Sequence, residues 1–181
     1  MNDNDKPEPK TEPASKSPFW RFSIKIYGVA GVAPACIELQ DQAGVDVNVL
    51  FFLLWNATQG RALNADDVTK IEDAIRPWRE MTVVPLRGIR RALKSPPSVM
   101  TPDAAEGFRT RIKSAELEAE RLQQEALYGI ATSGTLGRPS PSPAEAAQDS
   151  LSSYQGVIGP FPSGPLETIL SAFAGFKLGG S

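Results

Sequence analysis

The feature that most constrains this chain is the apolar run "VLFFLLW", residues 49–55. Its seven residues are far fewer than the roughly 20 that a membrane-spanning helix needs. Asp46 can accept the free amide hydrogens of a first helical turn, so we expect a helix over residues 47–58 that ends before Gly60. Apolar side chains would lie on nearly every side of it, which predicts a buried helix at the centre of a bundle. A short β-strand is the alternative, but no partner strand is apparent.

Capping residues and apolar periodicity predict further helices on both sides of this run. Ser17 and Thr101 each precede a proline, and such a pair combines an N-cap with a residue suited to the first helical turn. Pro85 should break one helix and begin the next. The fold class is predicted to be all-α, a small helical bundle of about five short helices plus one long helix, with disordered termini. The expected helices outside the central run cover residues 18–27, 32–42, 65–81, 85–94, 102–130 and 165–178.

Composition divides the chain into four predicted parts. Residues 1–17 are charged and proline-rich, which is typical of a disordered tail, and residues 18–130 are expected to form the all-α domain. Residues 131–164 are rich in Gly, Ser and Pro and are predicted to be a linker. Residues 165–178 are predicted to form an amphipathic C-terminal helix. The N-terminus lacks the apolar segment of a secretory signal, so the expected location is cytoplasmic.

The chain contains no histidine, and Cys36 is its only cysteine. Without histidine we expect no Ser-His-Asp centre, no Cys-His centre and no zinc site built on histidine. One cysteine cannot form an intramolecular disulfide or a cysteine-rich metal site, and its apolar neighbours favour a buried, inert thiol. We therefore expect no cofactor and no metal. If the protein is an enzyme, its catalytic residues cannot be identified from this sequence.

The strongest candidate binding site is the basic run from Arg76 to Lys94, where six cationic residues are opposed only by Glu80. Arginine forks bind carboxylates and phosphates, so this helical face is predicted to bind an acidic protein or other polyanion. Nucleic acid is an alternative partner, although no stacking aromatic residue lies on the arginine face. The simpler interpretation is a solvated face neutralised by acidic residues of the following helix, such as Glu116. The candidate residues are Arg76, Arg79, Arg87, Arg90, Arg91 and Lys94.

A second candidate is the polar cluster of Asp41, Asp46 and Asn48 between two predicted helices. Two carboxylates and an amide at this spacing could bind Mg²⁺ or act as general acid and base. In the structural interpretation, Asp46 is only an N-cap and Asp41 pairs with an arginine of the basic run. That interpretation is favoured, because no third carboxylate lies nearby in the sequence to complete a metal site.

Two further segments carry apolar stripes that need a partner. The seam of the long helix would pack on the bundle or on another copy of the chain, so a homodimer through residues 108–126 is an alternative assembly. The segment "PLETILSAFAGFKLGG" would dock on its own domain or bind a partner, while its single lysine disfavours a membrane surface. The seam residues are Phe108, Ile112, Ala115, Ala119, Leu122 and Ala126.

Two long motifs, LQDxxGxDVNxLxFLLW and WxxxxVxPLRxxRRxLK, together resemble a known family. The pattern is similar to that of short uncharacterised bacterial proteins that are classed as a domain of unknown function. The resemblance covers about residues 18–94 and continues more loosely through "ELEAER". It implies no reaction, cofactor, substrate or catalytic residue.

The sequence therefore predicts a non-enzymatic binding or adaptor module of the bacterial cytoplasm that uses its basic face. The alternative is an enzyme that acts on a phosphorylated small molecule through Asp41, Asp46 and the arginines. Geometry separates the two hypotheses. An open pocket that joins the aspartates and arginines would favour the enzyme, and closed ion pairs would favour binding or a structural role.

Overall fold

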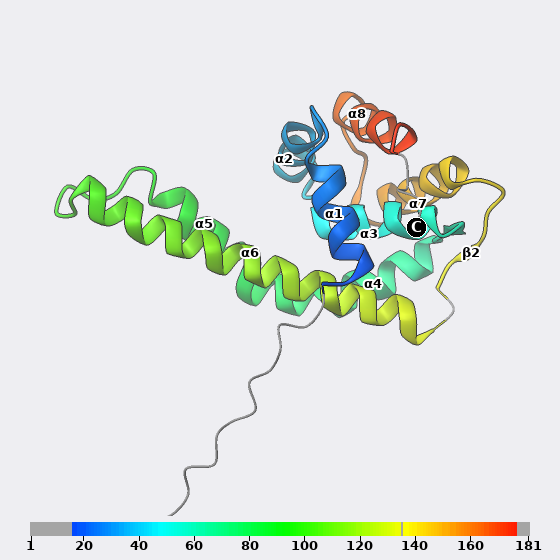
Figure 1. The fold of residues 1–181 in the computed structure, drawn as a ribbon, viewed down its shortest axis with the longest axis horizontal. Helices are drawn as coiled ribbons and strands as arrows, with labels where there is room; N and C mark the ends of the chain where they lie inside the picture. Colours follow the sequence, from blue (N-terminus) through cyan, green and yellow to red (C-terminus); the bar gives the residue numbers. More distant parts are fainter. Residues whose placement is uncertain (1–15, 135, 177–181) are drawn as a thin grey trace, which may run out of the picture.

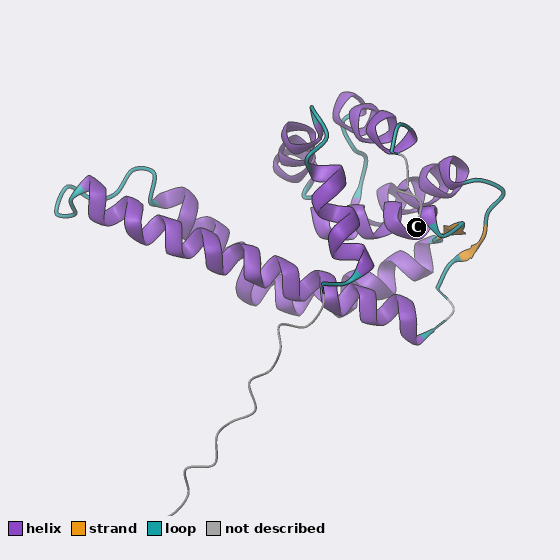
Figure 2. Cartoon of the chain, in the orientation of Figure 1, coloured by secondary structure: helices purple, strands orange, loops and turns teal. Residues whose placement is uncertain are grey.

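The computed structural model describes residues 16–134 and 136–176 of the 181-residue chain. Within these ranges almost all regular structure is helical (Figure 1, Figure 2), which confirms the predicted all-α class. Most of the predicted disordered tail, residues 1–15, lies outside the described residues. The elements are α1 (Pro18–Tyr27), α2 (Val32–Ala43), α3 (Val47–Thr58), β1 (Arg61–Ala62), α4 (Ala65–Trp78), the π-helical turn η1 (Arg79–Val83), α5 (Val84–Ala92), α6 (Pro102–Ser133), β2 (Arg138–Pro139), α7 (Pro143–Ile158) and α8 (Ser163–Ala174).

The apolar run forms α3, which packs against α1, α6 and α7 in the middle of the globular body (Figure 1). As predicted, the Asp46 carboxylate caps this helix by accepting hydrogen bonds from the amides of Asn48 at 2.8 Å and Val49 at 3.4 Å. Every residue from Val49 to Leu54 is buried, so the run is a core helix and the alternative strand is wrong. Among the described helices, none alone is long and apolar enough to cross a membrane. In the described part of the chain, the pair α1 and α2 passes that test when taken together, and it is bent by 98° at the break between the two helices.

The predicted break at Pro85 is wrong, because the chain stays helical from α4 through η1 into α5. The π-helical turn explains how the proline is accommodated. The Val84 amide donates to the Arg79 carbonyl, five residues back, and Pro85 follows at the transition to α5, where the hydrogen-bond pattern is already shifting. The side chains on this continuous rod therefore keep a fixed relation from the globular body outwards.

α5 and the first half of α6 lie side by side and project from the globular body (Figure 1, Figure 2). We call this helical hairpin, residues 84–120, the arm. The predicted seam of α6 is only partly correct, because the buried face of α6 is shifted round the helix by about one residue. Ala119 is buried, Ile112 is half-buried, and the other predicted seam residues are exposed. The buried residues of α6 are Ala105, Glu116, Ala119, Gln123, Gln124 and Leu127.

The prediction of a linker over residues 131–164 is wrong, because this segment contains the helix α7, which packs on α3 and α4. Its inward face consists largely of small residues that composition assigns to a linker. They share helical spacing with two larger side chains, Leu151 and Tyr154, and all are buried. Ser142 accepts a hydrogen bond from the Glu145 amide and precedes Pro143, so the helix begins with the same N-cap and proline pair as α1. The small buried residues are Ala146, Ala147 and Ser150.

The C-terminal helix α8 docks on its own chain along α2 (Figure 1). Ile169 and Phe173 are buried in the core, and the Phe176 ring lies edge-on to the Phe22 ring with 5.2 Å between the centroids. The predicted helix over residues 165–178 is thus present, beginning at Ser163, while residues 177–178 lie outside the described residues. Of the alternatives for this segment, docking on its own domain is the one observed.

The burial of α7 makes a prediction about stability. Leu151 is 1% exposed, so Leu151→Ala should lower the free energy of unfolding by about 2–5 kcal/mol through lost transfer energy and a cavity. Denaturant titration followed by circular dichroism measures this change. Gln148→Ala on the exposed side of the same helix is the control and should change stability little. Equal stability of both variants would mean that residues 143–158 behave as the linker that composition suggested.

Candidate functional site

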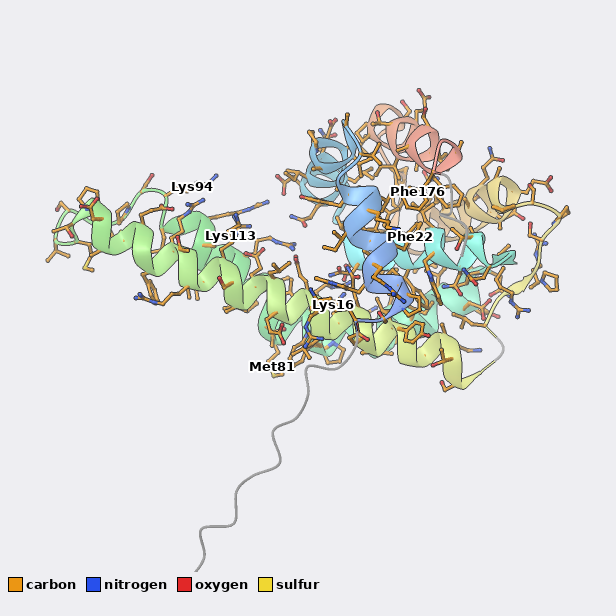
Figure 3. The ribbon with its side chains drawn as sticks, viewed as in Figure 1. Lys16, Phe22, Met81, Lys94, Lys113 and Phe176 are labelled. Atoms are coloured by element: carbon orange, nitrogen blue, oxygen red, sulfur yellow. The ribbon has the colours of Figure 1, made fainter. Side chains whose placement is uncertain are left out.

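An open groove of about 1000 Å³ separates the arm from α1 and α2. One face of each of these helices lines it. From α1 come Trp20, Ser23, Ile24 and Tyr27, which recur at the three- and four-residue spacing of a single helical face. The arm supplies most of the charged residues, and Figure 3 shows that Lys94 and Lys113 lie on the side of the arm that faces α1 and α2. The other charged lining residues are Asp41, Asp46, Arg79, Arg87, Arg90, Arg91, Glu116 and Glu120.

At the inner end of the groove, Arg79 bridges two buried carboxylates. Its Nη1 atom lies 2.9 Å from Asp46 Oδ2, and its Nη2 atom lies 2.8 Å from Glu72 Oε2. The two carboxylates outweigh the effect of burial and hold the pKa of Arg79 above its ordinary value. Arg79 therefore joins the start of α3 to α4 and is fixed in place by structural ion pairs.

Side chains from α6 and α7 complete this buried network. Tyr154 donates from its hydroxyl to Glu72 Oε1 at 2.9 Å and accepts a hydrogen bond from the Asp46 amide at 3.1 Å. Gln123 Nε2 donates to Asp46 Oδ2 at 2.7 Å. Burial, reinforced by the carboxylates of Glu72 and Asp46, raises the pKa of the Tyr154 hydroxyl. Tyr154 therefore stays protonated and acts as a hydrogen-bond donor.

A second set of ion pairs closes most of the arginine face. Arg87 donates to Glu116 at 2.9 Å and to Glu120 at 2.6 Å, and Arg90 also pairs with Glu116. Arg91 lies 2.9 Å from Asp41 in a pair that is about half exposed. The predicted neutralisation of the basic run by the following helix is therefore observed at Arg87 and Arg90, whereas Arg91 pairs with α2. Such pairs contribute little to stability when exposed, but they occupy the arginine forks.

The pKa values of two glutamates in this set shift in opposite directions. At Glu116, burial raises the pKa, but hydrogen bonds from Arg90 and Arg87 outweigh it and hold the pKa below 4.5. At Glu120, burial dominates over the attraction of Arg87, so its pKa is raised. Glu116 thus carries the fixed charge of the cluster, whereas burial opposes ionisation of Glu120.

Two lysines of the groove have no carboxylate partner among the described residues. Lys94 lies at the end of the basic run and Lys113 on α6, and neither makes an ion pair within residues 16–134 and 136–176. Arg76, by contrast, pairs with Asp73 and does not line the groove. The free cationic character of this site therefore resides in the two lysines.

The groove exposes apolar side chains, and beneath its surface lie two buried polar atoms that have no hydrogen-bond partner among the described residues. Ile24, Ile37 and Leu117 are 53%, 51% and 52% exposed, and all three line it. Ser23 is 3% exposed and Gln124 is 5% exposed, yet Ser23 Oγ and Gln124 Oε1 form no hydrogen bond with the described residues. An enclosed polar atom without a partner is costly in a folded protein, and both atoms are too deeply enclosed for an occupant of the groove to reach.

The groove brings together most of the residues that the sequence singled out. Arg79, Arg87, Arg90, Arg91 and Lys94 lie on it with Asp41, Asp46 and Asn48, but Arg76 does not. Asp46 is the N-cap and Asp41 pairs with Arg91, as the structural interpretation of that cluster holds. Asn48 accepts a hydrogen bond from Gln124 Nε2 at 2.7 Å. Among the described residues, no group of three or more cysteine, aspartate and glutamate side chains could hold a metal ion.

Several residues of the site were missed from the sequence. Glu72 lies on the buried stripe of α4 with Val68, Ile71 and Ile75, and a charged residue on an apolar stripe is the signal that could have revealed it. Tyr154 fell in the predicted linker. Lys113 belongs to the long helix, where only the apolar seam attracted attention.

Comparison with known proteins places the chain in a family. A family model described as protein of unknown function (DUF2390) matches residues 18–127, which is more than half of the chain. The chain belongs to the DUF2390 family. The match confirms the expected membership of a family of unknown function and continues beyond residue 94 through most of α6. Neither the comparison with curated proteins nor that with solved structures found a significant match.

The DUF2390 match covers α1 to α5 and most of α6 but stops before α7 and α8. All of the groove-lining residues fall within residues 18–127. Tyr154, which completes the buried network, lies outside that span. The family model therefore covers the residues that line the groove but not Tyr154, which bonds to the buried network at the inner end of the groove.

The Glu116 ion pairs predict a pH-dependent contribution to stability. Because the pKa of Glu116 is below its ordinary 4.5 in the folded protein, its stabilisation is present above that value and is lost as the pH falls. Glu116→Gln should lower the free energy of unfolding at pH 7 by about 1–3 kcal/mol. The difference from the wild type should shrink as the pH falls toward 3, measured by denaturant titration at each pH. Glu118→Gln, which alters an exposed pair with Arg121, is the control and should change stability little at any pH. If Glu116→Gln lowers the free energy of unfolding equally at pH 7 and near pH 3, the ion pairs of Glu116 do not stabilise the fold as described.

The burial of the Cys36 thiol predicts that it reacts slowly while the protein is folded. Burial raises the pKa of Cys36 to about 12, and the side chain is enclosed between α2 and the core. At pH 8 the thiol is protonated and shielded, so a colourimetric thiol reagent should react slowly with the folded protein and rapidly in denaturant. Immediate reaction without denaturant would contradict this.

Proposed function

We propose that this protein is a non-enzymatic binding module that holds an acidic segment of a partner protein in the groove between the arm and α1–α2. Its expected setting is the bacterial cytoplasm. The observation that carries the proposal is the presence of Lys94 and Lys113, which have no carboxylate partner within residues 16–134 and 136–176, on a groove that also exposes apolar side chains. Such a surface offers an acidic protein both charge attraction and apolar burial.

The proposal narrows the basic-face hypothesis. Arg87 and Arg90 are held by Glu116, so they contribute little free charge to a ligand. Six cationic side chains and four carboxylates line the groove, which leaves a modest positive excess near the two lysines. This excess favours a ligand with a few acidic residues combined with apolar ones. A nucleic acid backbone, which demands many unpaired cations, suits it less well.

The enzyme is the second candidate, because Asp41, Asp46 and the arginines do line one open groove. Their bonding speaks against catalysis. Asp46 already accepts hydrogen bonds from two amides, from Arg79 and from Gln123, so no lone pair is free to act as a base. The groove is therefore better suited to holding a ligand than to proton transfer at that carboxylate.

Charge reversal tests the proposal. Wild-type protein and the Lys94→Glu/Lys113→Glu variant are used to capture partners from nuclease-treated lysate of the native host, and bound proteins are identified and purified. An acidic protein should bind the wild type and lose on the order of tenfold in affinity to the variant, with weaker binding at higher salt. Nuclease treatment removes partners held only through nucleic acid.

The matched control is Lys16→Glu/Lys70→Glu, which makes the same change in net charge at exposed positions away from the groove. This control should retain the partner. Circular dichroism checks that all variants are folded. If both double variants retain the same partners with the same affinity, the groove lysines have no role in binding and the proposal fails.

A further inference from the structure

We propose that the element received by the groove is a single amphipathic α-helix of the partner, about three turns long, with acidic residues at one end. This inference rests on the proposed function and adds the shape and polarity of the bound segment. Four observations carry it, namely the walls of the groove, its lack of backbone partners, its apolar stripe and its two chemically different ends.

The walls of the groove are helix faces. On α1, residues 20, 23, 24 and 27 face it, and on α6, residues 113, 116, 117, 120 and 124 do so. Both sets follow the three- and four-residue spacing of one helical face. On the rod formed by η1 and α5, residues 79, 83, 87 and 90 repeat in the same way, and residue 94 follows just beyond the end of α5. Ridges of side chains on neighbouring helices leave grooves that accept the ridges of another helix.

The groove offers no backbone edge to an extended peptide. The strands in the described residues are β1 and β2, and neither lines it. An extended segment pressed against apolar helix faces would leave its own amide and carbonyl groups without partners, which is costly. A helix satisfies these groups internally and presents only side chains. The surface therefore selects a helical partner over a β-strand.

Exposed apolar side chains supply the binding stripe. Ile24 and Tyr27 project from α1, Ile37 from α2, and Val84 and Leu117 from the two helices of the arm. All five are exposed large hydrophobic residues, and they face one another across one groove instead of being scattered over the surface. A concentration of apolar surface of this kind marks an interaction site. A helix with apolar residues at positions i, i+3 or i+4, and i+7 would cover it.

The two ends of the groove differ in chemistry, which gives the bound helix a direction. Lys113 and Gln124 are eleven residues apart on α6, or roughly 16 Å along the helix axis. Lys94 and Lys113 define the cationic end and attract acidic side chains of the partner. The other end, near Gln124 and Ser23, carries no unpaired charge among the described residues, so the acidic residues of the partner lie at the lysine end.

Designed peptides test the inference with the full-length protein. The probe is a fluorescein-labelled helical peptide with leucines at i, i+3, i+7 and i+10 and glutamates at one end only. A scrambled peptide of the same composition has no stripe. A third peptide carries a central proline that prevents helix formation. We expect fluorescence anisotropy to show binding of the stripe peptide on the order of tenfold tighter than that of either control peptide.

Two protein variants locate the binding. Ile37→Glu/Leu117→Glu places charge on opposite walls of the groove at half-exposed positions, and it should abolish the preference for the stripe peptide. Val99→Glu/Met100→Glu is the matched control, because it makes the same exchange at exposed residues of the loop at the tip of the arm. This control should bind like the wild type.

The outcomes separate the two proposals. Equal affinity for the stripe and scrambled peptides overturns the helical inference, while loss of the captured acidic partner on Lys94→Glu/Lys113→Glu would still support the proposed function. Binding that is unchanged in Ile37→Glu/Leu117→Glu also overturns the inference, because the groove would not be the site. If the stripe peptide fails to bind and the lysine variant captures the same partners as the wild type, both proposals fall.

Discussion

The rest of the structure depends on the ion pairs of Arg79 with the buried carboxylates of Asp46 and Glu72. Removing the arginine would leave two buried negative charges without a counter-charge, a loss that typically costs several kcal/mol, about 3–5. The network also fixes geometry, because Asp46 begins α3, Glu72 belongs to α4 and Arg79 begins the π-helical turn. The position of the arm relative to the core follows from it, since α5 continues directly from that turn.

The same network explains why the site is better suited to binding than to catalysis. Charged groups at the inner end of the groove are already paired with one another, whereas the outer end keeps two lysines without carboxylate partners in the described part of the chain. Between these ends lie apolar side chains from four helices. Rigid, satisfied polar groups support a surface without reacting with what lies on it, and the unsatisfied groups are the ones available to a ligand.

Local signals in the sequence were sufficient to predict most helices. Asp46, Ser17 and Thr101 cap the helices they were expected to cap, because capping is a property of a few adjacent residues. Long-range features were not predictable in the same way. The burial of α7 depends on small residues whose composition resembles a linker, and the pairing of Arg79 with Glu72 and Asp46 joins residues from separate elements. The helix break predicted at Pro85 is wrong because a π-helical turn, which has no simple sequence signal, continues the helix past this proline.

The position of Tyr154 has a consequence for what counts as the folding unit. Its hydroxyl bonds to Glu72 and to the Asp46 amide, and its ring packs edge-on against Phe161 with 5.4 Å between the centroids. The family model ends at residue 127, so the segment it recognises as a unit of descent is shorter than the segment that closes its core. In this chain, α7 and α8 complete the core from outside the matched segment. The segment that the family model matches therefore ends before the segment that forms the core of this chain.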